Sequence, residues 1–198
     1  MDGDRVRSER RMGPPGSENW HAMLDGAEAI LRDEGHAALT SRAVAERIGV
    51  KQRLVYYYFR TMDELVVELF RRSAERELAR IDGARSSDRP LREVWHICID
   101  TADTRLISEY MALANHNDDL KVEVVRFIED SRRMQIEAIV AAMERSAGTS
   151  AVAPPGLAIL ATSVALAMTR ERQLGVELGH AEAMAAIEAL IAGLEPDK

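Results

Sequence analysis

Apolar residues recur three or four positions apart along most of the chain, and nowhere do Val, Ile and Thr alternate with polar residues over a strand length. Leu24, Ala27 and Leu31 illustrate this spacing, because they share one face of a helix. Ser17 can cap that helix at its start, and Gly35 can end it. Aromatic residues make up only 5% of the chain, whereas the helix formers Ala, Leu, Glu and Arg are abundant. The sequence therefore predicts an all-α fold.

Capping residues, glycines and prolines divide this pattern into about nine helices. They are expected at about 17–34, 40–48, 51–59, 61–81, 90–99, 106–115, 119–146, 154–175 and 180–194, with a loop at 83–88. We expect a flexible basic N-terminal arm at 1–16, a three-helix helix-turn-helix DNA-binding domain at 17–62, and a helical ligand-binding and dimerisation domain at 63–198. The arginines of the arm either follow a DNA backbone or belong to a solvated tail.

The net charge of −7 argues against a protein that coats nucleic acid without specificity. Residues 41–60 nevertheless carry five basic side chains against one acidic side chain. Cys98 is the only cysteine, which excludes an internal disulfide. Pro154 and Pro155 interrupt the uncharged stretch at 146–169, and the N-terminus lacks the apolar core of an export signal. We therefore expect a cytoplasmic protein with no membrane span.

The most informative segment is 40–59, which predicts two short helices joined by a tight turn at Gly49. A second helix held out in this way enters the major groove of double-stranded DNA, where its first residues contact base edges. Lys51, Gln52 and Arg53 occupy those first positions. Gln can bond adenine through two hydrogen bonds, and Arg or Lys can bond guanine. The sequence therefore predicts a base-reading helix here.

Tyr56 and Tyr57 lie about one turn further along the same helix. A phenol at this point can donate to a phosphate oxygen and fix the register of the protein without reading sequence. The alternative is a helical hairpin with a purely structural role. A basic and aromatic helix this short is poorly suited to that role, so we favour DNA binding.

Several residues of this region follow a known spacing: Met23, Leu24, Asp25, Gly26, Ala27, Gly35, Thr40, Val44, Ala45, Gly49, Val50, Tyr56, Tyr58, Phe59 and Leu65. At this spacing, residues 20–65 resemble the DNA-binding domain of the TetR/AcrR family of transcriptional regulators. The resemblance implies that 50–58 form the recognition helix. It also implies phosphate contacts by Thr40, Arg42, Tyr56 and Tyr57.

The chain departs from the family pattern in two places. Many members have Lys at the start of the fourth helix, where this chain has Met62, so that phosphate contact is lost or moved to Arg60. Many members also have small residues where this chain has Arg53 and Leu54. The operator preference of a relative therefore does not transfer to this chain.

The expected helix at 154–175 is apolar on nearly every side, which a small monomer cannot easily bury. Pairing this helix and the last helix with their copies would form a two-fold four-helix interface, as members of the TetR/AcrR family do. The residues expected in this homodimer interface are Leu157, Leu160, Val164, Met168, Met184, Ile187 and Ile191. The alternative is that the eighth helix forms the core of a monomer.

The fifth, sixth and seventh helices are expected to frame a pocket for a small-molecule effector of unknown identity. Its expected contacts are Trp95, Ile99, Tyr110, Met111, Phe127 and Met134. A ligand would act by favouring one spacing of the two recognition helices, through movement of the fourth helix.

These expectations describe a ligand-responsive repressor, released from a palindromic operator, that is not an enzyme and needs no cofactor. Two alternatives belong to other classes. His96, Asp100 and His116 would be the ligands of a metal-dependent enzyme, although their spacing is far from a recognised metal motif. A helical adaptor that binds only protein is the other alternative, and the basic segment argues against it.

Overall fold

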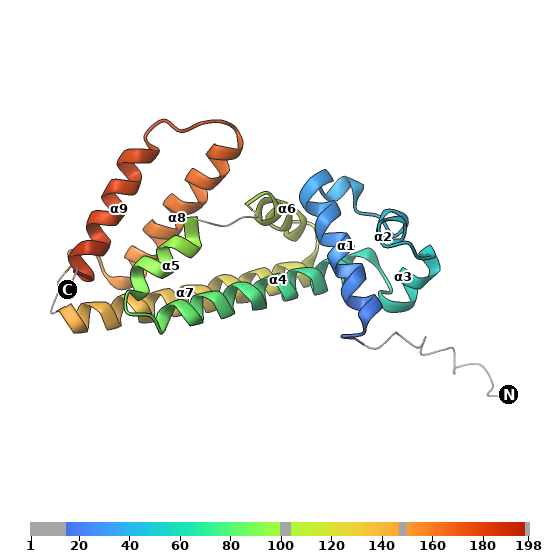
Figure 1. Cartoon of the computed structure of the whole chain (residues 1–198), viewed down its shortest axis with the longest axis horizontal. Helices are drawn as coiled ribbons and strands as arrows, with labels where there is room; N and C mark the ends of the chain where they lie inside the picture. Colours follow the sequence, from blue (N-terminus) through green and yellow to red (C-terminus); the bar gives the residue numbers. More distant parts are fainter. Residues whose placement is uncertain (1–14, 100–103, 147–149, 197–198) are drawn as a thin grey trace. The chain divides into compact units, whose positions relative to one another are not determined.

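The computed structural model describes residues 15–99, 104–146 and 150–196 of the chain (Figure 1). The regular structure within these residues is entirely helical. It consists of nine α-helices and one 3₁₀ turn: α1 (Glu18–Glu34), η1 (His36–Ala38), α2 (Ser41–Arg47), α3 (Gln52–Tyr58), α4 (Met62–Arg85), α5 (Pro90–Ile99), α6 (Thr104–Ala114), α7 (Asp118–Ser146), α8 (Pro154–Gln173) and α9 (His180–Leu194). The predicted all-α fold is confirmed.

The helix ends follow the capping signals in the sequence. The Ser17 hydroxyl accepts a hydrogen bond from the Trp20 amide at 3.3 Å and begins α1. Thr40 begins α2 in the same way, with the Ala43 amide as donor at 3.1 Å. The Asn117 side chain accepts from the Leu120 amide at 2.9 Å at the start of α7. These short-range bonds satisfy amide groups that have no partner inside the helix.

Three helix ends differ from the prediction by at least two residues, and one of them is the start of α6, at Thr104 rather than at 106. Helix α4 continues to Arg85, so the predicted loop at 83–88 begins later than expected. The Arg85 guanidinium forms ion pairs with Glu137 of α7 at 2.6 Å and with Asp82 at 3.4 Å, which stabilises the last turn. Helix α8 ends at Gln173, two residues early, and Gly175 follows with a φ of 78°.

The chain divides into two compact units. The described residues of the first unit lie within Met1–Arg72 and Glu109–Glu123, and those of the second within Ser73–Ser108 and Val124–Lys198. Helices α4, α6 and α7 contribute residues to both. The first unit is therefore larger than the predicted DNA-binding domain at 17–62, because it includes the first half of α4 and a segment around the α6–α7 turn.

Each unit has an apolar core of its own. Side chains of α1 to α4 and the start of α7 fill the first core, including Leu24, Val44, Phe59, Leu65 and Leu120. The second core joins α5, α7, α8 and α9 through Leu91, Trp95, Ala138, Ile139, Ala142, Leu157, Ala158, Ala165, Ile187, Ile191 and Leu194. No helix among the described residues combines the length and apolar character that crossing a bilayer requires.

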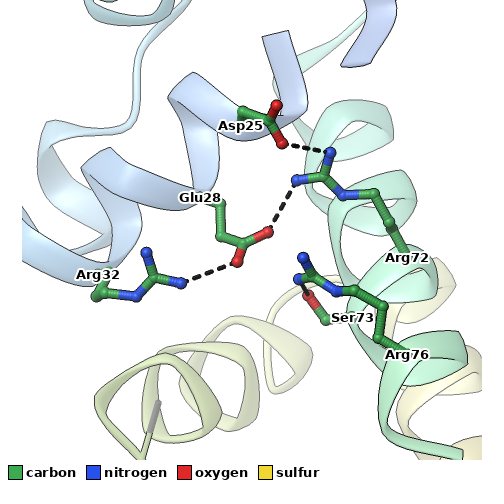
Figure 2. A network of polar contacts seen from close by, with 6 residues as sticks. All are labelled: Asp25, Glu28, Arg32, Arg72, Ser73 and Arg76. Carbon is green, nitrogen blue, oxygen red and sulfur yellow. Dashed lines mark hydrogen bonds and ion pairs between the residues drawn. The ribbon is translucent and has the colours of Figure 1, made fainter. Parts of the chain in front are cut away.

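A buried ion-pair network ties α4 to α1 within the first unit (Figure 2). Glu28 of α1 is 7% exposed, and its carboxylate accepts from Arg72 of α4 at 2.8 Å and from Arg32 at 2.8 Å. Arg72 also reaches Asp25 at 2.7 Å. The network therefore holds the first half of α4 against the helix that supports the helix-turn-helix.

Candidate nucleic-acid interface

Helices α2 and α3 pack against each other across a short turn. The Val50 amide donates to the Ala45 carbonyl at 2.9 Å, and Gly49 has a φ of 73°, a conformation that glycine adopts without strain. Val55 and Tyr58 are buried and hold the inner face of α3 against the unit. The opposite face of α3 is left in solvent.

The close approach of α1 to α2 also shapes this unit. A Cβ atom added at Gly26 would lie 2.7 Å from Cγ2 of Ile48, a separation shorter than real contacts. Only glycine allows α1 to pass so near the end of α2.

All eight residues predicted to contact DNA are exposed and belong to the first unit. They are Thr40, Arg42, Lys51, Gln52, Arg53, Tyr56, Tyr57 and Arg60. The two tyrosines are each 44% exposed although they are large and aromatic. The segment from the start of α2 to the end of α3 therefore presents basic and hydrogen-bonding side chains to solvent, as a DNA-contacting surface requires.

Ser41 is a functional candidate that sequence reasoning missed. Its side chain is buried, and its Oγ accepts a hydrogen bond from Gln52 Nε2 at 2.8 Å. The same hydroxyl donates to the Tyr56 Oη at 2.9 Å. The hydrogen of the Tyr56 hydroxyl is then free to donate to a phosphate, because the bond to Ser41 uses only a lone pair of the phenol. One hydroxyl on α2 thus orients two exposed side chains of α3.

The basic residues of the segment differ in their availability. Arg47 pairs with Glu34 at 2.6 Å and with Asp33 at 3.8 Å, so it joins α2 to α1. Lys51 and Arg53 have no ion pair among the described residues. These two cations at the start of α3 are available to DNA, whereas Arg47 is engaged in ion pairs that hold α2 against α1.

Arg42 is paired but still able to bind an anion. Its Nε donates to Glu46 Oε1 at 2.7 Å, a bond that raises the pKa of the guanidinium and keeps it charged. The two terminal nitrogens of the guanidinium remain available for a phosphate. Arg60 donates its backbone amide to Glu64 at 2.7 Å, and its side chain is exposed. Both arginines can reach outward from the ends of the helix-turn-helix.

The predicted ligand contacts lie in different places. Trp95 lines a cavity of the second unit, whereas Ile99 packs against the second core as a half-buried residue. Phe127 and Met134 are half-buried on α7 and lie outside the lining of that cavity. Tyr110 and Met111 belong to the first unit, where the ring of Tyr110 packs edge-on against Phe70 at 5.0 Å. Ligand binding by the residues outside the cavity stays a prediction.

The predicted dimerisation residues divide between the core and the surface. Leu157, Met168, Ile187 and Ile191 are buried within the chain itself. Val164 and Met184 are half-buried, and Leu160 is 50% exposed. The outer face of α8 carries other apolar side chains that were not predicted, Ile159 at 53% and Leu166 at 44% exposure. Helix α8 therefore both fills the core and leaves an apolar face in solvent.

The residues of the alternative metal site are not brought together in the described structure. His96 is exposed in the second unit, His116 belongs to the first unit, and Asp100 lies outside the described residues. Among the described residues, no group of three or more His, Cys, Asp or Glu side chains could hold a metal ion. The arginines of the N-terminal arm also lie outside the described residues.

An all-helical chain with an exposed basic helix after a tight turn defines the class of helix-turn-helix proteins. Residues 23–69 match the family model described as bacterial regulatory proteins, tetR family. The match confirms the predicted resemblance to the TetR/AcrR family for this part of the chain. No curated protein matches the chain in sequence.

Solved structures of transcriptional regulators share the fold. A regulator from Streptomyces coelicolor A3(2) has a TM-score of 0.66 at 19% identity, over 91% of this chain and 100% of that chain. A TetR transcription regulator from Haloarcula marismortui has a TM-score of 0.71 at 17% identity, over 85% and 94% of the two chains. SmeT, the repressor of the Stenotrophomonas maltophilia multidrug efflux pump SmeDEF, has 0.65 at 17%, over 93% and 91%. The family match and this fold support a DNA-binding transcriptional regulator rather than an enzyme.

Proposed function

We propose that this protein is a homodimeric, ligand-responsive repressor that binds a palindromic operator through α3. The observation that carries the proposal is the exposure of all eight predicted DNA-contacting side chains on one helix-turn-helix. Lys51, Gln52 and Arg53 begin α3, where a recognition helix meets base edges. Because protein and DNA must share a compartment, a cytoplasmic location is part of the proposal.

The proposed dimer forms through α8 and α9, and its two-fold symmetry is the reason for expecting a palindromic operator. Four large apolar side chains on these helices are 44% to 53% exposed, namely Ile159, Leu160, Leu166 and Leu190. Such a patch on a small protein marks an interaction surface. A second copy is the occupant we propose, because a two-fold axis would present two α3 helices to successive turns of the duplex.

Release of DNA by a small molecule completes the proposed function. A ligand changes operator affinity only if it binds one arrangement of the two α3 helices more tightly than the other. Helix α4 contributes residues to both units of the chain. We therefore assign to α4 the transmission of ligand binding from the second unit to the first.

The test is selection of bound fragments from random double-stranded DNA, with the native protein beside Gln52→Ala and Tyr56→Phe. Gln52→Ala should relax the preference at one base pair of each half-site, since a good bidentate contact discriminates by about 1–3 kcal/mol. Tyr56→Phe should weaken every selected site alike, because a phosphate contact carries no sequence information. Identical motifs and affinities for all three proteins would refute the assignment of α3.

A matched pair of lysine variants controls for loss of charge. Lys51 is the N-cap of α3, and Lys121 is an exposed lysine of α7 in the same unit. Lys51→Ala should weaken operator binding several-fold, because a cation that touches DNA contributes to affinity. Lys121→Ala should leave the affinity and the selected motif unchanged. Equal losses in both variants would point to non-specific attraction instead of a defined interface.

A further inference from the structure

A cavity of about 80 Å³ lies within the second unit, between α5, α7, α8 and α9. Its lining contains no charged residue. Eleven aliphatic side chains form most of the wall, and four residues with polar or polarisable groups complete it: Trp95, Cys98, Gln135 and Thr162. The cavity is several times larger than the roughly 10–15 Å³ of such space that one water molecule needs. A small organic molecule is the occupant that such a wall favours.

Trp95 supplies a buried hydrogen-bond donor. The side chain is 3% exposed, and its indole Nε1 is buried without a partner among the described residues. A buried donor is nearly always paired in a folded protein, because leaving it unpaired loses its hydrogen bond to water. Trp95 belongs to the lining of the cavity, so its ring lies beside any molecule bound there.

Gln135 offers a second donor to the same cavity. Its side chain is 8% exposed, and its Oε1 lies 3.1 Å from Thr162 Oγ1. Within the part of the chain that the structure describes, its Nε2 has only the sulfur of Cys98 as a partner, at 3.9 Å. Sulfur is a weak acceptor, and an amide nitrogen carries two N–H groups, so at least one N–H remains for a ligand.

The chemistry of Cys98 also favours a neutral ligand. Burial raises the pKa of this thiol to about 11, and the charge of Glu77 adds to the rise. The thiol is therefore protonated and uncharged at neutral pH. A charged ligand would lose its hydration in this cavity without a counter-ion in the lining.

The cavity has an accessible side. Leu160 of α8 and Leu190 of α9 belong to the lining but are 50% and 47% exposed. In the single chain, the wall therefore reaches the surface at these two leucines, in the region that the proposed second copy would cover.

We propose that this cavity binds an uncharged, mostly apolar small molecule with a carbonyl or similar acceptor, which receives the indole N–H of Trp95. The ligand class includes ketones, esters and lactones. The inference names the class of ligand for the proposed ligand response. It rests on that proposed function only for the claim that ligand binding changes operator affinity. It also differs from the expected pocket, since Trp95 is the only predicted ligand contact in this lining.

Acetophenone and isopropenylbenzene are the probes that test the acceptor, because they have the same shape and only the ketone accepts a hydrogen bond. The protein has two tryptophans, so the indole N–H resonances of the ¹⁵N-labelled chain are assigned with Trp20→Phe. Acetophenone should move the Trp95 indole proton downfield in a saturable titration. Isopropenylbenzene should bind without that downfield shift, and benzoate should not bind.

Two variants test the donors by calorimetry on the whole chain without DNA. Trp95→Phe should weaken acetophenone binding about fivefold, the size expected for the loss of one hydrogen bond. The same variant should change isopropenylbenzene binding less than twofold, because this probe accepts no hydrogen bond. Gln135→Leu keeps Trp95 and should weaken acetophenone by a smaller factor. A Trp95 resonance that stays in place with every probe, or equal losses for both probes in Trp95→Phe, would overturn the inference.

These binding measurements are independent of operator binding. Absence of acetophenone binding in a protein that still selects its operator would reject the cavity and leave the proposed DNA-binding function in place. Binding of acetophenone with no effect on operator affinity would reject the proposed ligand response and leave the binding site standing.

Discussion

Single hydroxyl and amide groups orient the surface that faces DNA. Ser41 accepts from Gln52 and donates to Tyr56, so two exposed residues of α3 share one buried anchor on α2. Holding long side chains in place before DNA arrives reduces the conformational entropy lost on binding. Ser41 is therefore a positioning residue that acts through Gln52 and Tyr56.

Ser41→Ala should weaken operator binding about threefold to tenfold and relax base preference at the position read by Gln52, because both side chains lose their anchor. The free energy of unfolding should fall by about 1 kcal/mol, the contribution of an ordinary hydrogen bond. Ser41→Thr keeps a hydroxyl and should retain most of the native selectivity. Ser86→Ala, at an exposed position in the turn after α4, is the matched control. A native motif selected by Ser41→Ala would remove the positioning role.

Helices of the first unit are joined by ion pairs between elements distant in the sequence. Glu28 of α1 binds Arg72 of α4 (Figure 2), and the buried Glu123 of α7 binds Arg71 of α4 at 2.7 Å. The bond to Glu123 is the main reason that the pKa of Arg71 is raised. Two successive arginines thus attach α4 to two different helices.

Glu28→Gln should destabilise the first unit by about 2–4 kcal/mol, because it removes a buried carboxylate that pairs with Arg72. Among the described residues, Asp25 is then the remaining charged partner of this guanidinium. The change is measured as a lower midpoint of urea unfolding, followed by tryptophan fluorescence. Asp25→Asn is the matched control, since the Asp25 side chain is 71% exposed and its ion pair should contribute less than about 1 kcal/mol. Equal midpoints for the two variants would show that burial of Glu28 does not govern this attachment.

The molecule as a whole is proposed to work as a pair of chains. Leu166 lies on the outer face of α8, at seven positions from Ile159, so the two side chains share one helix face. Both are about half exposed in the single chain. Covering them with a second copy removes apolar surface from water, which favours association.

Leu166→Asp should convert the dimer into a monomer at micromolar concentration, because a carboxylate would be buried on the two-fold seam. Light scattering coupled to size-exclusion chromatography measures the mass. Operator affinity should fall together with the dimer, while the circular dichroism of the helices is retained. Val122→Asp, at a position 58% exposed on α7, should remain dimeric. A Leu166→Asp protein that stays dimeric would place the interface elsewhere.

Local sequence signals were sufficient for the helices and for the surface that faces DNA. Ser17, Thr40 and Asn117 cap helices as their positions predict, because a cap depends on residues within one turn. The exposed residues of α3 were also predictable, since Val55 and Tyr58 alone mark its inner face. The start of α9 at His180 was also predicted, although no side-chain cap begins this helix.

Only the tertiary structure decided which apolar faces are covered and which polar groups meet. Helical spacing marked Leu157 and Ile187 as apolar contacts, but packing placed them in the core of their own chain rather than on its surface. Gln135 and Thr162 are 27 residues apart and meet in one cavity with Trp95. Periodicity determines which face of a helix avoids water, whereas the partner that covers this face depends on the simultaneous packing of helices far apart in the chain.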